Sequence, residues 1–169
     1  MEKPSYKKIR PGKSKYAVLD DPYLKQKYKD STICPSCGAV YTNKRWYFDI
    51  KLKTKILNEG KYFEKKCPAC RKIDDMYYMG IITLTGDFLR QHYEEIVRRI
   101  QNEEKKVLRI NPLERILRLK KESDRLTVET LTDNLAVRIG KAIYSSFKGV
   151  LEIKFDSDHS IVRIYWKRN

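Results

Sequence analysis

ICPSCG (residues 33–38) and KCPACR (residues 66–71) each contain two cysteines separated by two residues, and these four cysteines are the only ones in the chain. The proline after the first cysteine of each pair presets a tight turn. Two turns of this kind supply four sulfur ligands, the tetrahedral set that Zn²⁺ prefers in structural sites. The sequence therefore predicts one structural zinc ion, bound by Cys34, Cys37, Cys67 and Cys70.

Four sulfur ligands leave no coordination position open for water or substrate, so the predicted metal has a structural role. Its binding free energy, on the order of 10 kcal/mol, would stabilise a segment too short to build its own core. Two disulfides are the first alternative, but the first residues show no apolar signal stretch. A thioredoxin-like redox motif needs one C-x2-C rather than two. We therefore expect reduced thiols and a cytoplasmic location.

The charge balance indicates the class of partner. The chain has 37 Lys and Arg against 22 Asp and Glu, for a formal net charge of +15. Such a surplus favours a polyanion. A membrane surface is the less favoured polyanion, because the sequence has no long apolar run and no basic amphipathic helix. A length of 169 residues suits one domain with a small metal module and a tail.

Residues 1–30 are expected to form a basic N-terminal arm. Apolar residues are too sparse there for a core, and four tyrosines alternate with the basic residues. A solvated tail is the plain alternative. Interleaved tyrosines favour an arm that orders on nucleic acid, because tyrosine can stack on unpaired bases while lysine binds phosphate. The densest basic run consists of Lys7, Lys8, Arg10, Lys13 and Lys15.

Residues 31–79 are expected to form a zinc ribbon, a small antiparallel sheet held by the metal. Between the cysteine pairs, apolar and charged residues alternate from Phe48 to Ile56, and period two is typical of a strand. Residues 58–60 (NEG) predict a turn, after which Tyr62 and Phe63 begin a returning strand.

Basic and aromatic residues of this ribbon are candidate nucleic-acid contacts. On a strand, Lys51, Lys53 and Lys55 would project from one face together. Arg45 and Trp46 follow the first cysteine pair. Trp46 can serve as a lid over a small core, the commoner role, or as a stacking platform for a base.

Residues 80–169 predict an α+β domain. The second helix carries Gly140 in its apolar stripe, which would allow a close approach to the sheet. Expected strands and helices alternate in the order β-α-β-β-α-β-β, a split βαβ arrangement with an added hairpin. The expected strands are 80–85, 113–120, 126–131, 150–155 and 161–166, and the expected helices are 87–106 and 132–147. For 113–120 the apolar residues at 116, 117 and 119 also fit a helix.

Groups suited to catalysis are scarce in this sequence. The two histidines, His92 and His159, have no cysteine or serine partner at a recognised spacing. Neither a nucleophile elbow nor a zinc-protease motif nor a glycine-rich phosphate loop is present. We therefore expect a protein that is not an enzyme and has no small-molecule substrate.

Several stretches of the C-terminal half resemble a known family. LTVETLTD (126–133), LAVRIGKA (135–142), KGVLE (148–152) and VRIYWKR (162–168) are similar to the export adaptor of the large ribosomal subunit, nonsense-mediated-decay protein three. A group of short prokaryotic zinc-ribbon proteins is more similar, because it also pairs C-P-x-C-G and a downstream Arg-Trp with C-P-x-C. The adaptor has two cysteine quartets where this chain has one, so nuclear export is not implied.

The resemblance implies a factor that docks on the large ribosomal subunit during assembly or hibernation, with ribosomal RNA and ribosomal proteins as its partners. The arm and the ribbon would contact phosphates. A zinc-ribbon protein that binds DNA or associates with transcription is the alternative, although no recognition helix is visible. Further phosphate contacts are expected from Arg138, Lys141, Lys167 and Arg168.

Overall fold

The computed structural model describes residues 7–9, 21–156 and 161–169. Arg10, Lys13 and Lys15 of the expected arm lie outside these residues, and so does His159. For Lys7 and Lys8 the backbone alone is described. The described chain is a mixed α+β protein with two mixed sheets and five α-helices.

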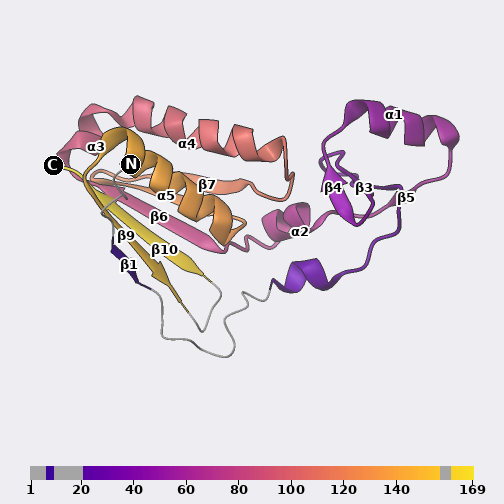
Figure 1. Cartoon of the computed structure of the whole chain (residues 1–169), viewed down its shortest axis with the longest axis horizontal. Coiled ribbons are helices and arrows are strands. Elements are labelled where there is room, and N and C mark those ends of the chain that lie inside the picture. Colours follow the sequence, from indigo (N-terminus) through magenta and orange to yellow (C-terminus); the bar gives the residue numbers. More distant parts are fainter. Residues whose placement is uncertain (1–6, 10–20, 157–160) are drawn as a thin grey trace, which may run out of the picture.

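A six-stranded sheet forms the larger part of the molecule (Figure 1). Its first strand, β1, pairs in parallel with β9, and β10 pairs in parallel with β6, while the other neighbours are antiparallel. Strand β8 lies between β6 and β7, which are joined through helices. The strands, in their order across the sheet, are β1 (Lys7–Ile9), β9 (Val150–Phe155), β10 (Val162–Lys167), β6 (Gly80–Thr85), β8 (Arg125–Thr130) and β7 (Ile116–Lys121).

Helices α3 (Asp87–Gln91), α4 (Tyr93–Leu108) and α5 (Asp133–Phe147) lie on one face of this sheet (Figure 1). From β6 to β10 the elements follow the predicted order, except that two helices, α3 and α4, stand where one was expected. The main core lies between helices and sheet, where alternate strand residues meet the apolar helix faces. At the centre of this packing, a Cβ on Gly140 would stand 2.8 Å from Cγ2 of Ile164. The predicted close approach at Gly140 is thus confirmed.

One predicted helix is two in the structure. The sequence indicated a single helix over 87–106, but His92 has non-helical backbone angles (φ −118°, ψ 26°) and separates α3 from α4. Its ring stacks on Phe88 at a centroid distance of 4.0 Å.

A second, four-stranded sheet belongs to residues 31–79, which we call the cysteine module. Its order is β4 (Arg45–Tyr47), β3 (Val40–Thr42), β2 (Thr32–Ile33) and β5 (Phe63–Glu64). Strands β2 and β5 are parallel, so the expected purely antiparallel sheet is wrong at this pair. The parallel pairing needs a crossover, and helix α1 (Ile50–Glu59) provides part of it.

Helix α1 replaces the strand expected over residues 48–56, which is a correction. Its start is fixed by Asp49, whose carboxylate accepts a hydrogen bond from the Leu52 amide at 3.0 Å, and its end by Gly60, which has φ +68°. Leu52 and Ile56, four residues apart, pack into the small core of the module. This i, i+4 pair, rather than the period-two alternation, determines the conformation.

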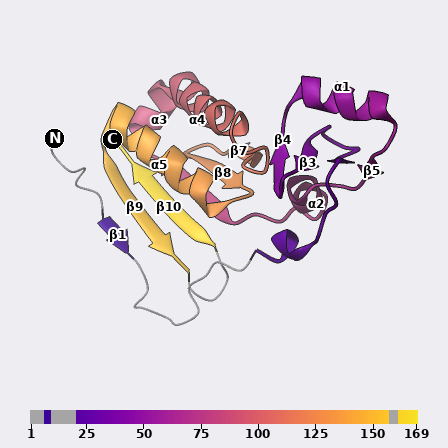
Figure 2. The same ribbon diagram turned by 45° about the vertical axis from the view of Figure 1, so that its right-hand side comes forward.

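The cysteine module lies beside one end of the large sheet, with β4 and helix α2 (Pro68–Asp74) on the side that faces it (Figure 2). A short 3-10 helix, η1 (Pro22–Lys25), precedes the module. Residues 21–30 pack against the module, so the expected free arm does not extend to residue 30. Within the described residues, no helix combines the length and apolar character needed to cross a membrane.

Candidate metal centre

The four cysteines predicted as metal ligands meet at one point. Their sulfur atoms all lie within 4.8 Å of one another, and the Cys37 and Cys67 sulfurs are 3.7 Å apart. Four sulfurs placed about 2.3 Å from a central zinc ion would be about 3.8 Å from each other. Three of the cysteines are buried and Cys37 is partly buried. The cluster can therefore hold one metal ion.

Local backbone geometry holds each pair in place. After the first pair, the Gly38 amide donates to the Cys34 carbonyl at 2.9 Å, and Gly38 has φ +74°, as this turn requires. In the second pair, Cys67 caps α2 and its sulfur accepts from the Cys70 amide at 3.4 Å. The Cys67 amide in turn donates to the Cys34 sulfur at 3.3 Å, which joins the two pairs. Such amide donors are the usual partners of metal-bound thiolates.

Arg115 is a member of the site that the sequence did not reveal. Its guanidinium donates from Nη2 to the Cys37 sulfur at 3.2 Å and from Nη1 to the Cys70 sulfur at 3.7 Å. Its Nε atom donates a hydrogen bond to the Pro112 carbonyl at 2.7 Å, which holds the guanidinium in place. Nothing near Arg115 in the sequence marks it as a partner of cysteines that precede it by 45 and 78 residues.

Close packing of the four thiols affects their ionisation. Hydrogen bonding with Cys34 and Cys37 raises the pKa of Cys67, and burial together with neighbouring thiolates raises the pKa of Cys70 to about 11. Hydrogen bonds from Cys37 and Cys67 lower the pKa of Cys34. The cluster without a cation therefore resists full ionisation, whereas a bound divalent cation would stabilise all four thiolates.

Trp46 takes the core role that was the commoner expectation. Its side chain is 6% exposed. The indole ring packs edge-on against Tyr28, with the ring centroids 4.9 Å apart, and in a tilted arrangement against Tyr41, with the centroids 5.3 Å apart. Little of the ring remains for stacking on a base. The neighbouring Arg45 is exposed, and both residues line a hollow whose far wall includes Leu113 of the large domain.

The three lysines expected to project together do not. On helix α1, Lys51 and Lys55 are exposed and four residues apart, whereas Lys53 lies elsewhere on the helix circumference. Its ammonium lies 2.9 Å from where a Cβ of Gly38 would be, against the first cysteine turn.

The four candidates in the large domain lie on α5 and at the end of β10. Arg138 on α5 pairs with Glu103 at 3.0 Å. Lys141, also on α5, is exposed. Arg168 donates to the Phe147 carbonyl at 2.5 Å and so stabilises the end of α5. Lys167 is exposed at the end of β10.

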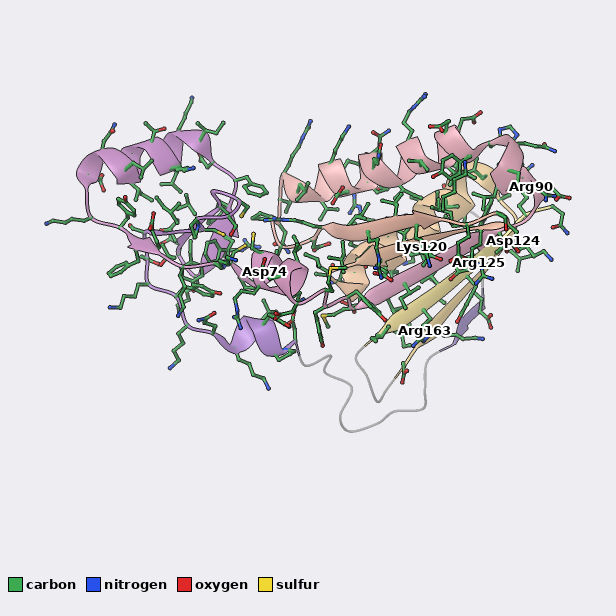
Figure 3. The ribbon with its side chains drawn as sticks, turned by 180° about the vertical axis from the view of Figure 1, so that it is seen from behind. Asp74, Arg90, Lys120, Asp124, Arg125 and Arg163 are labelled. Carbon is green, nitrogen blue, oxygen red and sulfur yellow. The ribbon has the colours of Figure 1, made fainter. Side chains whose placement is uncertain are left out.

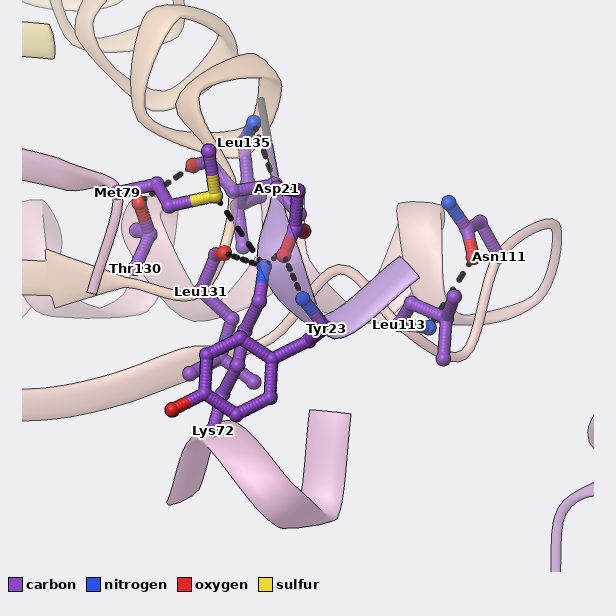
Figure 4. A network of polar contacts seen from close by, with 10 residues as sticks. Asp21, Tyr23, Lys72, Met79, Asn111, Leu113, Thr130, Leu131 and Leu135 are labelled. Carbon is purple, nitrogen blue, oxygen red and sulfur yellow. Dashed lines mark hydrogen bonds and ion pairs between the residues drawn. The ribbon is translucent and has the colours of Figure 1, made fainter. Parts of the chain in front are cut away.

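A buried lysine joins three parts of the chain beside the metal centre (Figure 4). Lys72 of α2 is 3% exposed and pairs with Asp21. Its ammonium also donates to the Leu131 carbonyl at 2.8 Å and contacts the Met79 sulfur at 3.2 Å. Burial lowers the pKa of Lys72, while the Asp21 carboxylate opposes this shift. The segment before the module, the module and the large domain therefore meet at one polar point.

Comparison with known proteins identifies no relative: no protein-family model, no curated protein and no solved structure matches this chain. The description of the site therefore depends on the geometry of its residues. Among the described residues, the four cysteines are the one group of cysteine, histidine and carboxylate side chains that could hold a metal. Fold and site together define a mixed α+β protein with a buried four-cysteine centre at the junction of its two sheets.

Proposed function

We propose that the four cysteines bind one structural zinc ion and that the cysteine module is a form of zinc ribbon attached to a split βαβ domain. The fit of the sulfur spacing to a tetrahedral site supports zinc. When bound, the ion would neutralise part of the thiolate charge and hold the two turns together. Because zinc needs reduced thiolates, we place the protein in the cytoplasm.

The metal centre would act as a joint between the two parts of the protein. Leu131 of the large domain belongs to the same hydrophobic cluster as Cys34, Cys67 and Cys70. Arg115 reaches the sulfurs from the segment that leads into β7. Metal binding would therefore fix the module against the domain.

We further propose that the protein binds RNA and is not an enzyme. The observation that carries this proposal is the surplus of 15 positive charges on the chain, which favours a polyanionic partner. Lysine and arginine side chains bind phosphates and release counterions. The resemblance of residues 126–168 to the export-adaptor family favours ribosomal RNA of the large subunit, in assembly or hibernation.

Sedimentation tests this function. The full chain, mixed with a cell extract and centrifuged through a sucrose gradient, should move with ribosomal subunits, and ribonuclease treatment should release it. A matched gradient treated with deoxyribonuclease serves as the control. Release by deoxyribonuclease and not by ribonuclease would contradict the proposal and favour a DNA-associated protein instead.

A further inference from the structure

None of the described helices and strands covers one face of the large sheet (Figures 1 and 3). Helices α3, α4 and α5 lie on the opposite face, and within the described residues no helix or strand lies over this one (Figures 1 and 3). The strand residues that point away from the helices are partly or fully exposed, and they alternate with fully buried ones along β6, β8 and β10. We call this surface the open sheet face.

Basic side chains are unusually frequent on the open sheet face. Figure 3 looks onto it and labels Lys120, Arg125 and Arg163. The face also carries four acidic residues. Two are on the strands, Glu129 and Glu152, and two are in the β7–β8 turn. The basic residues of the face are Arg118, Lys120, Arg125, Lys154, Arg163 and Lys167.

Ion pairs account for four of these six cations. Arg118 forms two hydrogen bonds with Glu129, at 3.0 and 2.7 Å, and Lys154 pairs with Glu152 at 3.4 Å. Lys120 and Arg125 both pair with Glu122 of the turn. Arg163 and Lys167 have no such partner among the described residues. The uncompensated positive charge of the face therefore lies on strand β10.

An exposed aromatic ring lies between these two cations. Arg163, Tyr165 and Lys167 alternate along β10 and so point to the same side. Tyr165 is 39% exposed although its strand is in the interior of the sheet. Its neighbours across β6 and β8 are Thr83 and then Thr127, which have small hydroxyl side chains, and the Lys154 ammonium of β9 lies 5.2 Å from the ring centroid.

We propose that the open sheet face binds a single strand of nucleic acid, with a base stacked on Tyr165 and phosphates bound by Arg163 and Lys167. The two cations are about 14 Å apart along an extended strand, so a bound strand would pass over the ring between them. This inference rests on the proposed RNA-binding function and locates its binding site. It also differs from the expected sites on the arm and on the cysteine module.

The chemistry of the face favours a single strand over a duplex or a protein. A duplex keeps its bases stacked inside, so an exposed ring on a flat sheet has no base to stack on. Unpaired bases stack on aromatic side chains of any sheet that presents them, and the basic residues bind the backbone. An acidic protein would be complementary to the charges, but it would not depend on the flat face of Tyr165.

Two variants, each with matched controls, test the proposal. Tyr165→Leu removes the aromatic ring, and Tyr165→Phe keeps it. Tyr62→Leu is the control, because Tyr62 in the cysteine module is also 39% exposed. R163Q/K167Q removes the two unpaired cations of the face. R98Q/K105Q makes the same charge change at two exposed residues of α4.

Binding would be measured by fluorescence anisotropy over a salt series, with a short labelled RNA strand, the DNA strand of the same sequence and an RNA duplex. Tyr165→Leu should weaken single-strand binding about fivefold or more, the loss expected for one base stack. Tyr165→Phe and Tyr62→Leu should bind as the parent does. R163Q/K167Q should lower the slope of log affinity against log salt by about 1.4, which corresponds to two phosphates of a single strand. Comparison of the RNA and DNA strands shows which sugar the face accepts.

Each outcome separates the two proposals. No binding of the parent to any RNA would contradict the proposed function itself. In another outcome, the parent binds RNA tightly while R163Q/K167Q, R98Q/K105Q and Tyr165→Leu all bind it equally well. This result would contradict the proposed binding site on the open sheet face but not the proposed function, and it would favour a protein partner for this face. Equal affinity for strand and duplex would also contradict the proposed binding site. Circular dichroism of each variant, unchanged from the parent, shows that the fold is intact.

Discussion

The Nη2 atom of Arg115 lies 3.2 Å from the sulfur of Cys37, although 78 residues separate them in the sequence. Four thiolates around a divalent cation carry a net charge of −2, and the guanidinium of Arg115 offsets part of it. Hydrogen bonds from such a partner orient metal ligands and tune their affinity. The large domain thus contributes directly to the electrostatics of a site whose ligands all come from the cysteine module.

Arg115→Gln should therefore weaken zinc binding. Loss of a partner that hydrogen-bonds metal ligands typically lowers metal affinity about 10–100-fold. Competition with a chromogenic chelator measures the affinity. Arg98→Gln, at an exposed residue of α4, is the charge-matched control and should leave it unchanged. Identical zinc affinity in both variants would show that the guanidinium has no role at the site.

Cys34→Ser should release the metal and unfold the cysteine module. The large domain should remain folded, because its main core shares no residue with the cluster around the cysteines. Its melting temperature should nevertheless fall, since Leu131 loses its packing partners there. Elemental analysis and limited proteolysis test this, with Ser36→Ala as control because Ser36 is exposed between the cysteines. An iron–sulfur absorption spectrum of the parent would contradict the zinc assignment.

Packing of α5 on the sheet predicts large losses of stability. Ile139 and Ile143 are fully buried, so each change to Ala should cost about 2–5 kcal/mol in the free energy of unfolding. Gly140→Val should cost about 1–3 kcal/mol, because the new side chain would collide with Ile164. Ser146→Ala, on the exposed side of the same helix, is the control. Urea denaturation curves that coincide for all four variants would refute this packing.

The buried carboxylate of Glu103 predicts a pH dependence. Burial would raise its pKa, but hydrogen bonds from Lys106 and Arg138 and the charge of Arg99 outweigh this and lower it below the usual 4.5. A group with a depressed pKa stabilises the fold above its unfolded-state pKa, and this contribution is lost as the pH falls through the folded-state value. Glu103→Gln should thus be less stable than the parent at neutral pH. The difference should shrink as the pH falls below about 4.5.

Denaturant melts at neutral and acidic pH measure this difference. Glu94→Gln is the matched control, because Glu94 is exposed at the start of the same helix. A Glu103→Gln variant whose deficit is constant across the pH range would show that the charge of this carboxylate does not matter. The pairing of Glu103 with Arg138 at 3.0 Å links α4 to α5, so the deficit should be accompanied by faster proteolysis between these helices.

Patterns that are local in the sequence predicted much of this structure. The two C-x2-C pairs came together as expected. The strands and helices from β6 to β10 follow the predicted order apart from the division of the first helix at His92, because most of them have a clear period. Thr132, for example, caps α5 by accepting a hydrogen bond from the Leu135 amide at 3.2 Å, at the start expected for this helix.

The failures occur where two patterns compete or where no local signal exists. Residues 48–56 alternate as a strand does, yet the Asp49 cap and the Leu52–Ile56 pair favour a helix, and burial against β2 and β3 decides between them. Arg115 and Lys72 make contacts with residues far away in the sequence. Such contacts depend on the packing of the cysteine module against the domain, which no single stretch specifies.

Binding of the full chain to purified large ribosomal subunits over a salt series, with duplex DNA in parallel, tests the central claim most directly. Each phosphate bound by a lysine or arginine contributes just under one unit to the slope of log affinity against log salt for a duplex, and about 0.7 for a single strand. We predict a steep slope and clearly tighter binding to the subunits than to the DNA at every salt concentration. Equal affinity for the two, or no salt dependence, would contradict the account of this protein as an RNA-binding protein of the ribosome.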